Sequence, residues 1–273
     1  MRGCRLRDCG APDCPTCSGS EAARLYREQR AAPGKRVADT RDFMTTQSIE
    51  TEKGSAESLH RFVGRLGSTS ELYFGDCADV IGRLNTVDAV ITDPPYGIGS
   101  WSSTGGNSIS QAQADEINEW DCPVPEKVLR EAISLGKVSV VWGGNYLMDV
   151  LGKCRAPLVW DKAIRGMHFA DGEMAWTSFD WGTLRILNFP LASGDTKGRK
   201  VHPTQKPTRV MAWSLEQAKI EKGMTVLDPF MGSGTTGVVC AMLGVNFIGI
   251  ERDAAHYKTA CDRIAHELDG ALL

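Results

Sequence analysis

From residue 71 onward, short apolar or β-branched runs alternate with longer helical stretches. Runs of this length predict strands, and strands that alternate with helices indicate βαβ units around a largely parallel, doubly wound sheet. Two segments lack clear periodicity, 97–125 and the parts of 162–207 between and after its short strands. Structureless loops of that length in a compact domain are usually functional. The expected strands are 71–74, 88–92, 138–142, 158–161, 175–179, 184–188, 225–227 and 247–250, and the expected helices are 126–135, 208–219, 235–243 and 254–268.

The length of 273 residues suffices for one large domain with a small appendage. No apolar run approaches the roughly 20 residues of a membrane helix. The N-terminus also lacks the apolar stretch of a secretory signal. We therefore expect a cytoplasmic protein without a membrane partner. The net charge of −3 gives no global basic field, so any surface for nucleic acid has to be local.

Residues 1–68 show little apolar periodicity beyond a short helical pattern near 21–29, which indicates a tail or small appendage before a main domain at 69–273. Cys14 and Cys17 have the two-residue gap of a zinc knuckle. Together with Cys4 and Cys9 they form a candidate metal set. Only four residues separate Cys9 from Cys14, too few for the usual loop between ligand pairs. We expect no metal site, with zinc as the alternative, and we expect the other five cysteines to be small buried residues.

The expected strand 225–227 runs into a turn of small residues and then into a helix. Glycines let the backbone approach a ligand closely, and a helix N-terminus offers free N–H groups to a carboxylate or phosphate. Glu251 ends the next strand, where a carboxylate can accept both hydroxyls of a ribose. A glycine turn with a ribose acid predicts a nucleoside-containing cofactor. The cofactor candidates here are Asp228, Phe230, Gly232, Ser233, Gly234, Thr235 and Glu251.

Asp93, Pro94, Pro95 and Tyr96 directly follow the apolar strand 88–92. Two prolines have fixed φ and no N–H, so they form a rigid end without hydrogen-bond donors. An aryl amino group is a poor nucleophile because its lone pair is delocalised into the ring. The Asp93 carboxylate and the Pro94 carbonyl could accept its two N–H hydrogens, and Tyr96 could stack against an unstacked base. The tetrapeptide therefore predicts a catalytic site in which an aryl amino group attacks an electrophile.

At these residues the chain resembles the amino-group DNA methyltransferases, and its motif order is similar to that of their beta class. There the catalytic Asp-Pro-Pro-Tyr precedes the Phe-x-Gly-x-Gly cofactor motif, as residues 93–96 precede residues 230–234 here. The segment with Asp76 and Cys77 resembles the one whose acid contacts the cofactor adenine. Residues 142–146 resemble a stretch that lines the base pocket. Residues 202–207, with Thr204 and Lys206, resemble the lead-in to a helix that closes over the methionine end of the cofactor.

The resemblance implies a seven-stranded mixed sheet with one antiparallel strand, in a circularly permuted, Rossmann-like methyltransferase fold. It implies S-adenosyl-L-methionine as cofactor, bound also by Asp93, and N6 of adenine in double-stranded DNA as target, since members with aspartate first mostly modify adenine. N4 of cytosine is the alternative. A catalytically silent DNA-binding regulator is a further alternative, which the intact motifs disfavour. An RNA or protein amino-methyltransferase is disfavoured because those families usually place the cofactor turn first.

Target recognition is expected in the aperiodic segments 97–125 and 162–207, because arginine, asparagine and glutamine read base edges well. A local basic cluster at 197–209 suits phosphate. A homodimer and a cognate restriction endonuclease are partners that the resemblance suggests. The DNA-contact candidates are Trp101, Lys162, Arg165, His168, Arg185, Lys197, Arg199 and Lys200, with Asn107, Gln111, Gln113 and Asn188 as further readers.

Overall fold

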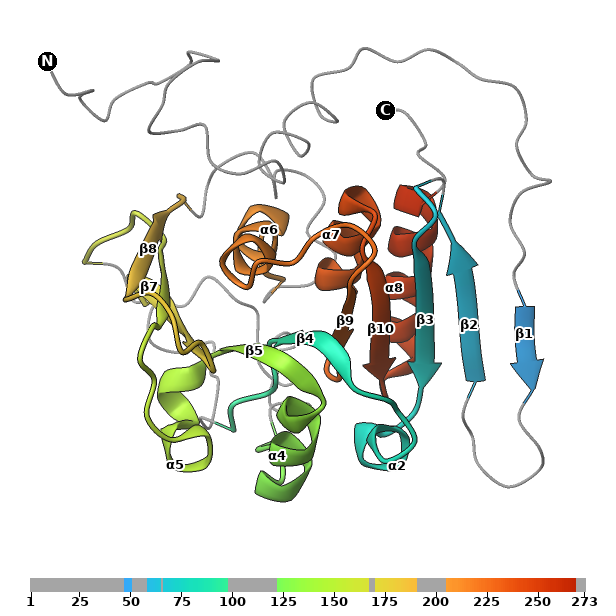
Figure 1. Cartoon of the computed structure of the whole chain (residues 1–273), viewed down its shortest axis with the longest axis horizontal. Coiled ribbons are helices and arrows are strands. Elements are labelled where there is room, and N and C mark those ends of the chain that lie inside the picture. The colour runs from blue at the N-terminus through green and yellow to red at the C-terminus, as the bar shows by residue number, and fades with distance from the viewer. Residues whose placement is uncertain are drawn as a thin grey trace, which may run out of the picture.

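A computed structural model of the chain describes residues 47–50, 58–64, 66–97, 122–166, 170–190 and 205–268. Within these ranges ten strands form one mixed sheet (Figure 1). In spatial order the strands are β1 (Gln47–Glu50), β2 (Ser58–Val63), β3 (Thr69–Phe74), β10 (Asn246–Glu251), β9 (Thr225–Asp228), β4 (Val87–Thr92), β5 (Gly136–Trp142), β7 (Gly172–Thr177), β6 (Leu158–Asp161) and β8 (Arg185–Asn188).

The centre of the sheet is parallel, because β3, β10, β9, β4 and β5 pair with one another in the same direction. Strand β7 is antiparallel to both β5 and β6. The run from β3 to β6 contains the seven strands and the single antiparallel strand that the sequence led us to expect. The described sheet is larger by three edge strands, however. Strand β8 pairs with β6 and extends the sheet at that end. At the other end, β2 pairs with β3 and β1 pairs with β2, and both of these strands come from residues that we had assigned to the N-terminal appendage.

The chain order of the strands is permuted relative to their spatial order. Strands β9 and β10 are the last two in the sequence, yet they lie between β3 and β4. This insertion brings the end of β9 beside the end of β4, although Asp93 and Asp228 are far apart in the sequence. The permuted fold expected from the motif order is thereby confirmed.

Helices cover both faces of the sheet (Figure 1). On one face, α6 (Thr208–Gln217), α7 (Thr235–Leu243) and α8 (Ala254–Leu268) pack side by side. On the other face lie α2 (Cys77–Ile81), α4 (Glu126–Ser134) and α5 (Met148–Leu151), and a short 3-10 helix, η2 (Gly144–Tyr146), follows β5. Among the described helices, none is long and apolar enough to cross a membrane.

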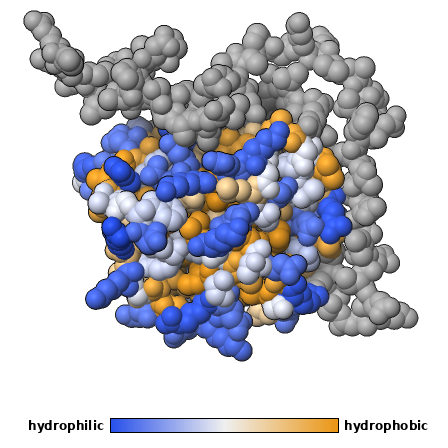
Figure 2. Space-filling model, in the orientation of Figure 1, coloured by the Kyte–Doolittle hydropathy of each residue, from blue (hydrophilic) through white to orange (hydrophobic). Residues whose placement is uncertain are grey.

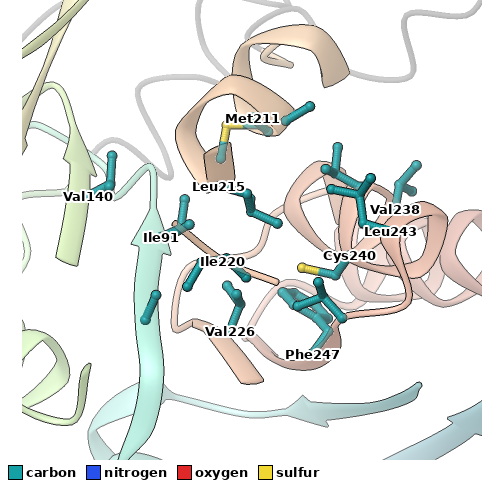
Figure 3. Close-up of a cluster of buried hydrophobic side chains, with 14 of the residues drawn as sticks. Ile91, Val140, Met211, Leu215, Ile220, Val226, Val238, Cys240, Leu243 and Phe247 are labelled. Carbon is teal, nitrogen blue, oxygen red and sulfur yellow. The ribbon is translucent and has the colours of Figure 1, made fainter. Parts of the chain in front are cut away.

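The main hydrophobic core lies between the sheet and the layer formed by α6, α7 and α8. Ile91 of β4 and Val140 of β5 meet Met211 and Leu215 of α6, and Phe247 of β10 packs nearby (Figure 3). Burial of large aliphatic side chains contributes roughly 1.5–3 kcal/mol each, so this layer anchors the strands whose ends form the site. On the side of the molecule seen in Figure 2, apolar residues also reach the surface in the middle, between polar residues around them.

Candidate active site

Several predicted functional segments meet at the carboxyl ends of the parallel strands. Asp93 follows β4, Asp228 ends β9, Glu251 ends β10, and Asp76 follows β3, while Gly143 follows β5. These five strands are neighbours and run in the same direction, so their carboxyl ends lie together. Ligands of doubly wound sheets bind at the carboxyl ends of the strands. The fold therefore brings the two sequence motifs into one site.

The carboxylate of Asp93 is held by two donors. The Tyr96 hydroxyl donates to Oδ1, and the Lys206 ammonium donates to Oδ2 at 2.6 Å. Burial raises the pKa of Tyr96 well above its ordinary value, and the charge of Asp93 adds to this, so the hydroxyl stays protonated and donates. Asp93 remains partly exposed at 30% of its side-chain surface, so a substrate can reach it. Pro94 behind it is buried.

Lys206 joins this site to a second carboxylate, that of Glu173 on β7. Its ammonium lies 2.8 Å from Glu173 Oε2 and 3.3 Å from the Tyr96 hydroxyl oxygen, and it also lies over the ring of Trp142. Burial alone would lower the pKa of Lys206, but the charges of Asp93 and Glu173 raise it well above its usual value. Lys206 therefore stays protonated beside Asp93.

Glu173 is itself held by a second lysine. Lys162 lies 2.7 Å from Glu173 Oε1 and packs over the ring of Trp160. Burial alone would raise the pKa of Glu173, but Lys206 and Lys162 lower it to about 2. The site thus contains a chain of ion pairs from Asp93 through Lys206 and Glu173 to Lys162, in which Glu173 is ionised at neutral pH. The motifs in the sequence gave no signal for Glu173.

Two aromatic rings stack beside the carboxylate. The ring centroids of Tyr96 and Tyr146 are 5.2 Å apart, with the planes inclined by 27°, and Tyr146 is 52% exposed. Gly143 permits this arrangement because it has a φ of 68°, and a Cβ placed on it would lie 1.9 Å from the Tyr96 ring. The segment that we expected to line a base pocket therefore touches Tyr96 directly.

The glycine turn after β9 has the features of a cofactor turn. Gly234 has a φ of 79° and starts α7, and no side chain caps this helix. The carboxylate of Glu251 accepts a hydrogen bond from the Gly232 N–H at 2.9 Å, which fixes the acid beside the turn. An uncapped helix N-terminus suits a carboxylate, and an acid at the next strand end suits a ribose. The residues present fit a nucleoside cofactor that carries an amino acid.

The carboxylate of Asp228 lies below this turn. It accepts hydrogen bonds from the hydroxyls of Thr92 and Thr236 at 2.7 and 2.6 Å and from the N–H of Phe230 at 3.2 Å. Burial raises its pKa to about 6. Because Thr92 ends β4 and Thr236 belongs to α7, the hydrogen bonds of Asp228 link the end of β4 to the helix that follows the glycine turn.

The remaining cofactor candidates have different environments. Asp76 is exposed and caps α2 by accepting the Ala78 N–H at 2.9 Å, whereas Cys77 is buried and its pKa is raised by burial to about 12. Sequence reasoning overlooked Arg263 of α8. Its guanidinium donates to the carbonyl and hydroxyl oxygens of Ser233 and to the Thr235 hydroxyl, so it supports the turn from α8. Thr204 lies outside the described residues.

The DNA-contact candidates fall into two groups. Lys162 is only 11% exposed and bound to Glu173, and Arg165 is 61% exposed but forms two hydrogen bonds with the Asp161 carboxylate. Arg185 is exposed at the start of β8. The described ranges contain no cluster of metal-ligating side chains. Outside the described residues lie Trp101, Asn107, Gln111, Gln113, His168, Lys197, Arg199, Lys200 and the set Cys4, Cys9, Cys14 and Cys17.

A permuted doubly wound sheet with a nucleoside-cofactor turn beside an amino-group acceptor site is the architecture of an S-adenosylmethionine-dependent methyltransferase. Residues 141–262 match the model of the N6/N4 methyltransferases, a family of DNA methylases. This region of the chain is therefore similar to a family of DNA methylases. S-adenosylmethionine supplies an activated methyl group, and the turn 232–235 with Glu251 would hold it.

Two curated relatives have similar sequences. The Type II methyltransferase M.HinfI of Haemophilus influenzae is 26% identical over 243 residues, which span 70% of this chain and 67% of that protein. The Type II methyltransferase M2.MboI of Moraxella bovis is 25% identical over 247 residues, spanning 74% of this chain and 89% of that protein. The crystal structure of an M1.HpyAVI–SAM complex superimposes with a TM-score of 0.47 at 24% identity, covering 71% of this chain and 98% of that one.

Proposed function

We propose that the chain methylates N6 of adenine in double-stranded DNA after the base has been flipped out of the helix. The observation that carries this proposal is the Asp93 carboxylate, held at the end of β4 beside the cofactor turn. An exocyclic amino group needs acceptors that localise its lone pair toward the methyl donor. Asp93 supplies one such acceptor at the carboxyl end of β4, and the carbonyl of the rigid Pro94 is the second acceptor in this proposal.

Asp93 retains acceptor capacity for the substrate. An ionised carboxylate has about four lone-pair sites, and Tyr96 and Lys206 occupy one on each oxygen. The sites that remain can accept an N–H of the amino group and then the proton that it loses. A well-placed base contributes about a hundredfold to ten-thousandfold in rate. Positioning of the two reactants supplies most of the rest.

The tyrosine pair supports base flipping. Stacking between aromatic side chains is a common way to hold an extruded base. Tyr96 is fixed through its hydroxyl to Asp93, while the ring of Tyr146 stacks on it and is half exposed to solvent. A flipped base could thus stack on Tyr96 with its amino group toward Asp93, displacing or joining Tyr146.

Adenine is preferred over cytosine because aspartate stands first in the tetrapeptide, as in most adenine-modifying relatives. Asp93 would serve an N4-cytosine substrate by the same chemistry, so cytosine is the second candidate. The similarity to Type II methyltransferases also suggests a role in a restriction–modification system, with a cognate endonuclease as separate partner. Arg185, the basic cluster at 197–209 and a homodimer belong to the same proposal for DNA binding.

The test is expression of the full chain in a methylation-deficient bacterium, followed by single-molecule sequencing of its genomic DNA, with Asp93→Ala as control. We expect N6-methyladenine at one short motif, absent from the control. Purified Asp93→Ala should keep its affinity for S-adenosylmethionine within about threefold in calorimetry, because it removes an acceptor of the base. N4-methylcytosine would overturn the adenine assignment, and methylation by Asp93→Ala would overturn the role of Asp93.

A further inference from the structure

The charged chain behind Asp93 has an arrangement that the proposed chemistry does not by itself require. Lys206 is 6% exposed and lies between two carboxylates, 2.6 Å from Asp93 Oδ2 and 2.8 Å from Glu173 Oε2. A single carboxylate would already neutralise the ammonium. The second one belongs to β7, away from both sequence motifs.

We propose that Glu173 is a positioning residue that keeps Asp93 available to the substrate amino group by holding back the Lys206 ammonium. This inference rests on the proposed function, in which Asp93 accepts hydrogen bonds from the target base. Glu173 does not touch the substrate in this scheme. It acts through Lys206.

Competition for Asp93 gives the physical reason. A buried ammonium has three N–H donors that all need acceptors, because little water reaches it. In the structure these donors face Asp93, Tyr96 and Glu173. Without the Glu173 charge, the ammonium would be drawn more closely to the one remaining carboxylate. It would then occupy lone pairs that the amino group needs.

The position of Glu173 is itself fixed. Lys162 binds its other oxygen at 2.7 Å, and the backbone of Glu173 pairs with Trp160 of β6, so both the carboxylate and the strand that carries it are held away from Asp93. The two lysines and two carboxylates balance in charge. The network can therefore stay ionised while it limits how strongly Lys206 binds Asp93.

The experiment compares Glu173→Gln and Glu173→Asp in the full-length protein, with Glu126→Gln as matched control. Glu126 is 61% exposed and pairs with Arg130 on the surface of α4, so its substitution also removes one ion pair. For Glu173→Gln we expect kcat for DNA methylation to fall about tenfold or more, while Kd values for S-adenosylmethionine and DNA change by less than about threefold. Glu173→Asp keeps the charge and should recover about threefold or more of that loss.

Base flipping gives a readout besides turnover. With 2-aminopurine beside the target adenine, Glu173→Gln should bind DNA but show a smaller rise in fluorescence, because the 6-amino group of the flipped adenine is held less firmly at Asp93. Equal kcat for Glu173→Gln and wild type, or equal kcat for the Gln and Asp variants, would overturn the inference. A parallel loss of cofactor affinity would do so as well. An inactive wild-type protein would instead refute the proposed function.

Discussion

The buried carboxylate of Asp228 depends on hydroxyl and amide donors for its stabilisation. Burial raises its pKa from 3.8 to about 6, and the donors of Thr236 and Thr92 offset only part of that rise. Between these two pH values the folded protein keeps a proton that the unfolded chain releases. The stability contributed by this group is therefore fully present below pH 3.8 and is lost as the pH rises through about 6.

We predict that Asp228→Asn removes this pH dependence. An amide keeps a similar shape without a charge, and the hydroxyl that faces its NH2 group can rotate to accept instead of donating. Relative to wild type, the variant should gain about 3 kcal/mol of unfolding free energy between about pH 4 and pH 7, since two pKa units correspond to about that energy. Urea unfolding at several pH values measures it. Asp88→Asn is the control with opposite sign, because Lys137 and the Thr225 N–H lower the pKa of Asp88.

At the scale of elements, the junction between β5 and η2 determines where Tyr96 lies. Gly143 occupies left-handed φ space, and any side chain there would collide with the Tyr96 ring. Gly152 has a similar φ of 73°, but a Cβ on it would meet nothing within 4 Å. A comparison of substitutions at these two glycines therefore distinguishes the effect of backbone strain from the effect of a collision with Tyr96.

We predict that Gly143→Ala lowers kcat for DNA methylation by about a hundredfold, because Tyr96 must leave its position beside Asp93. Gly152 has a ψ of −157°, in a region that is almost restricted to glycine, so Gly152→Ala should lower stability by about 1–3 kcal/mol, with kcat nearly unchanged. Steady-state kinetics and denaturant unfolding on both variants provide the comparison. Similar kcat values for the two variants would show that Tyr96 does not need its observed place.

The strands after residue 69 and the longer helices were predictable from the sequence, but the shortest helices were not. The helices expected at 235–243 and 254–268 coincide with α7 and α8, and the strand expected at 158–161 coincides with β6. Helices α2 and α5 contain five and four residues, too few to show helical periodicity. Asp76 at the N-cap of α2 was the available signal, but its position in a cofactor segment drew a functional interpretation instead.

At the scale of the whole molecule, motif order predicted the permutation but not the contacts behind the motifs. Asp93 and the glycine turn could be found because they carry local patterns that the fold must place at strand ends. Glu173 and Lys162 carry no such pattern, since their roles depend on β7 lying beside β5 and β6. Lys162 was expected to contact DNA from an aperiodic loop, and it lies in the network behind Asp93 instead.

The extent of the folded unit is a second property of the whole molecule. The sequence suggested that the main domain begins at residue 69, yet β2 pairs along the full length of β3. Phe62 of β2 is 8% exposed and belongs to the main core, whereas its neighbour Val63 points outward and is 54% exposed. We propose that β2 is part of the same cooperative domain.

The adjacent substitutions Phe62→Ala and Val63→Ala test this proposal. If β2 folds with the rest, Phe62→Ala should lower the free energy of unfolding by about 3 kcal/mol. Val63→Ala should change it by less than about 1 kcal/mol. Denaturant unfolding can be followed by tryptophan fluorescence. The buried residues Trp142 of β5 and Trp160 of β6 contribute to this signal, and their strands lie toward the opposite edge of the sheet from β2. A fluorescence transition that stays at the wild-type midpoint in Phe62→Ala would mean that β2 only docks on a domain that is stable without it. A shift of that transition would place the domain boundary before β2. It would show that removing the Phe62 side chain from β2 destabilises the core around β5 and β6 as well.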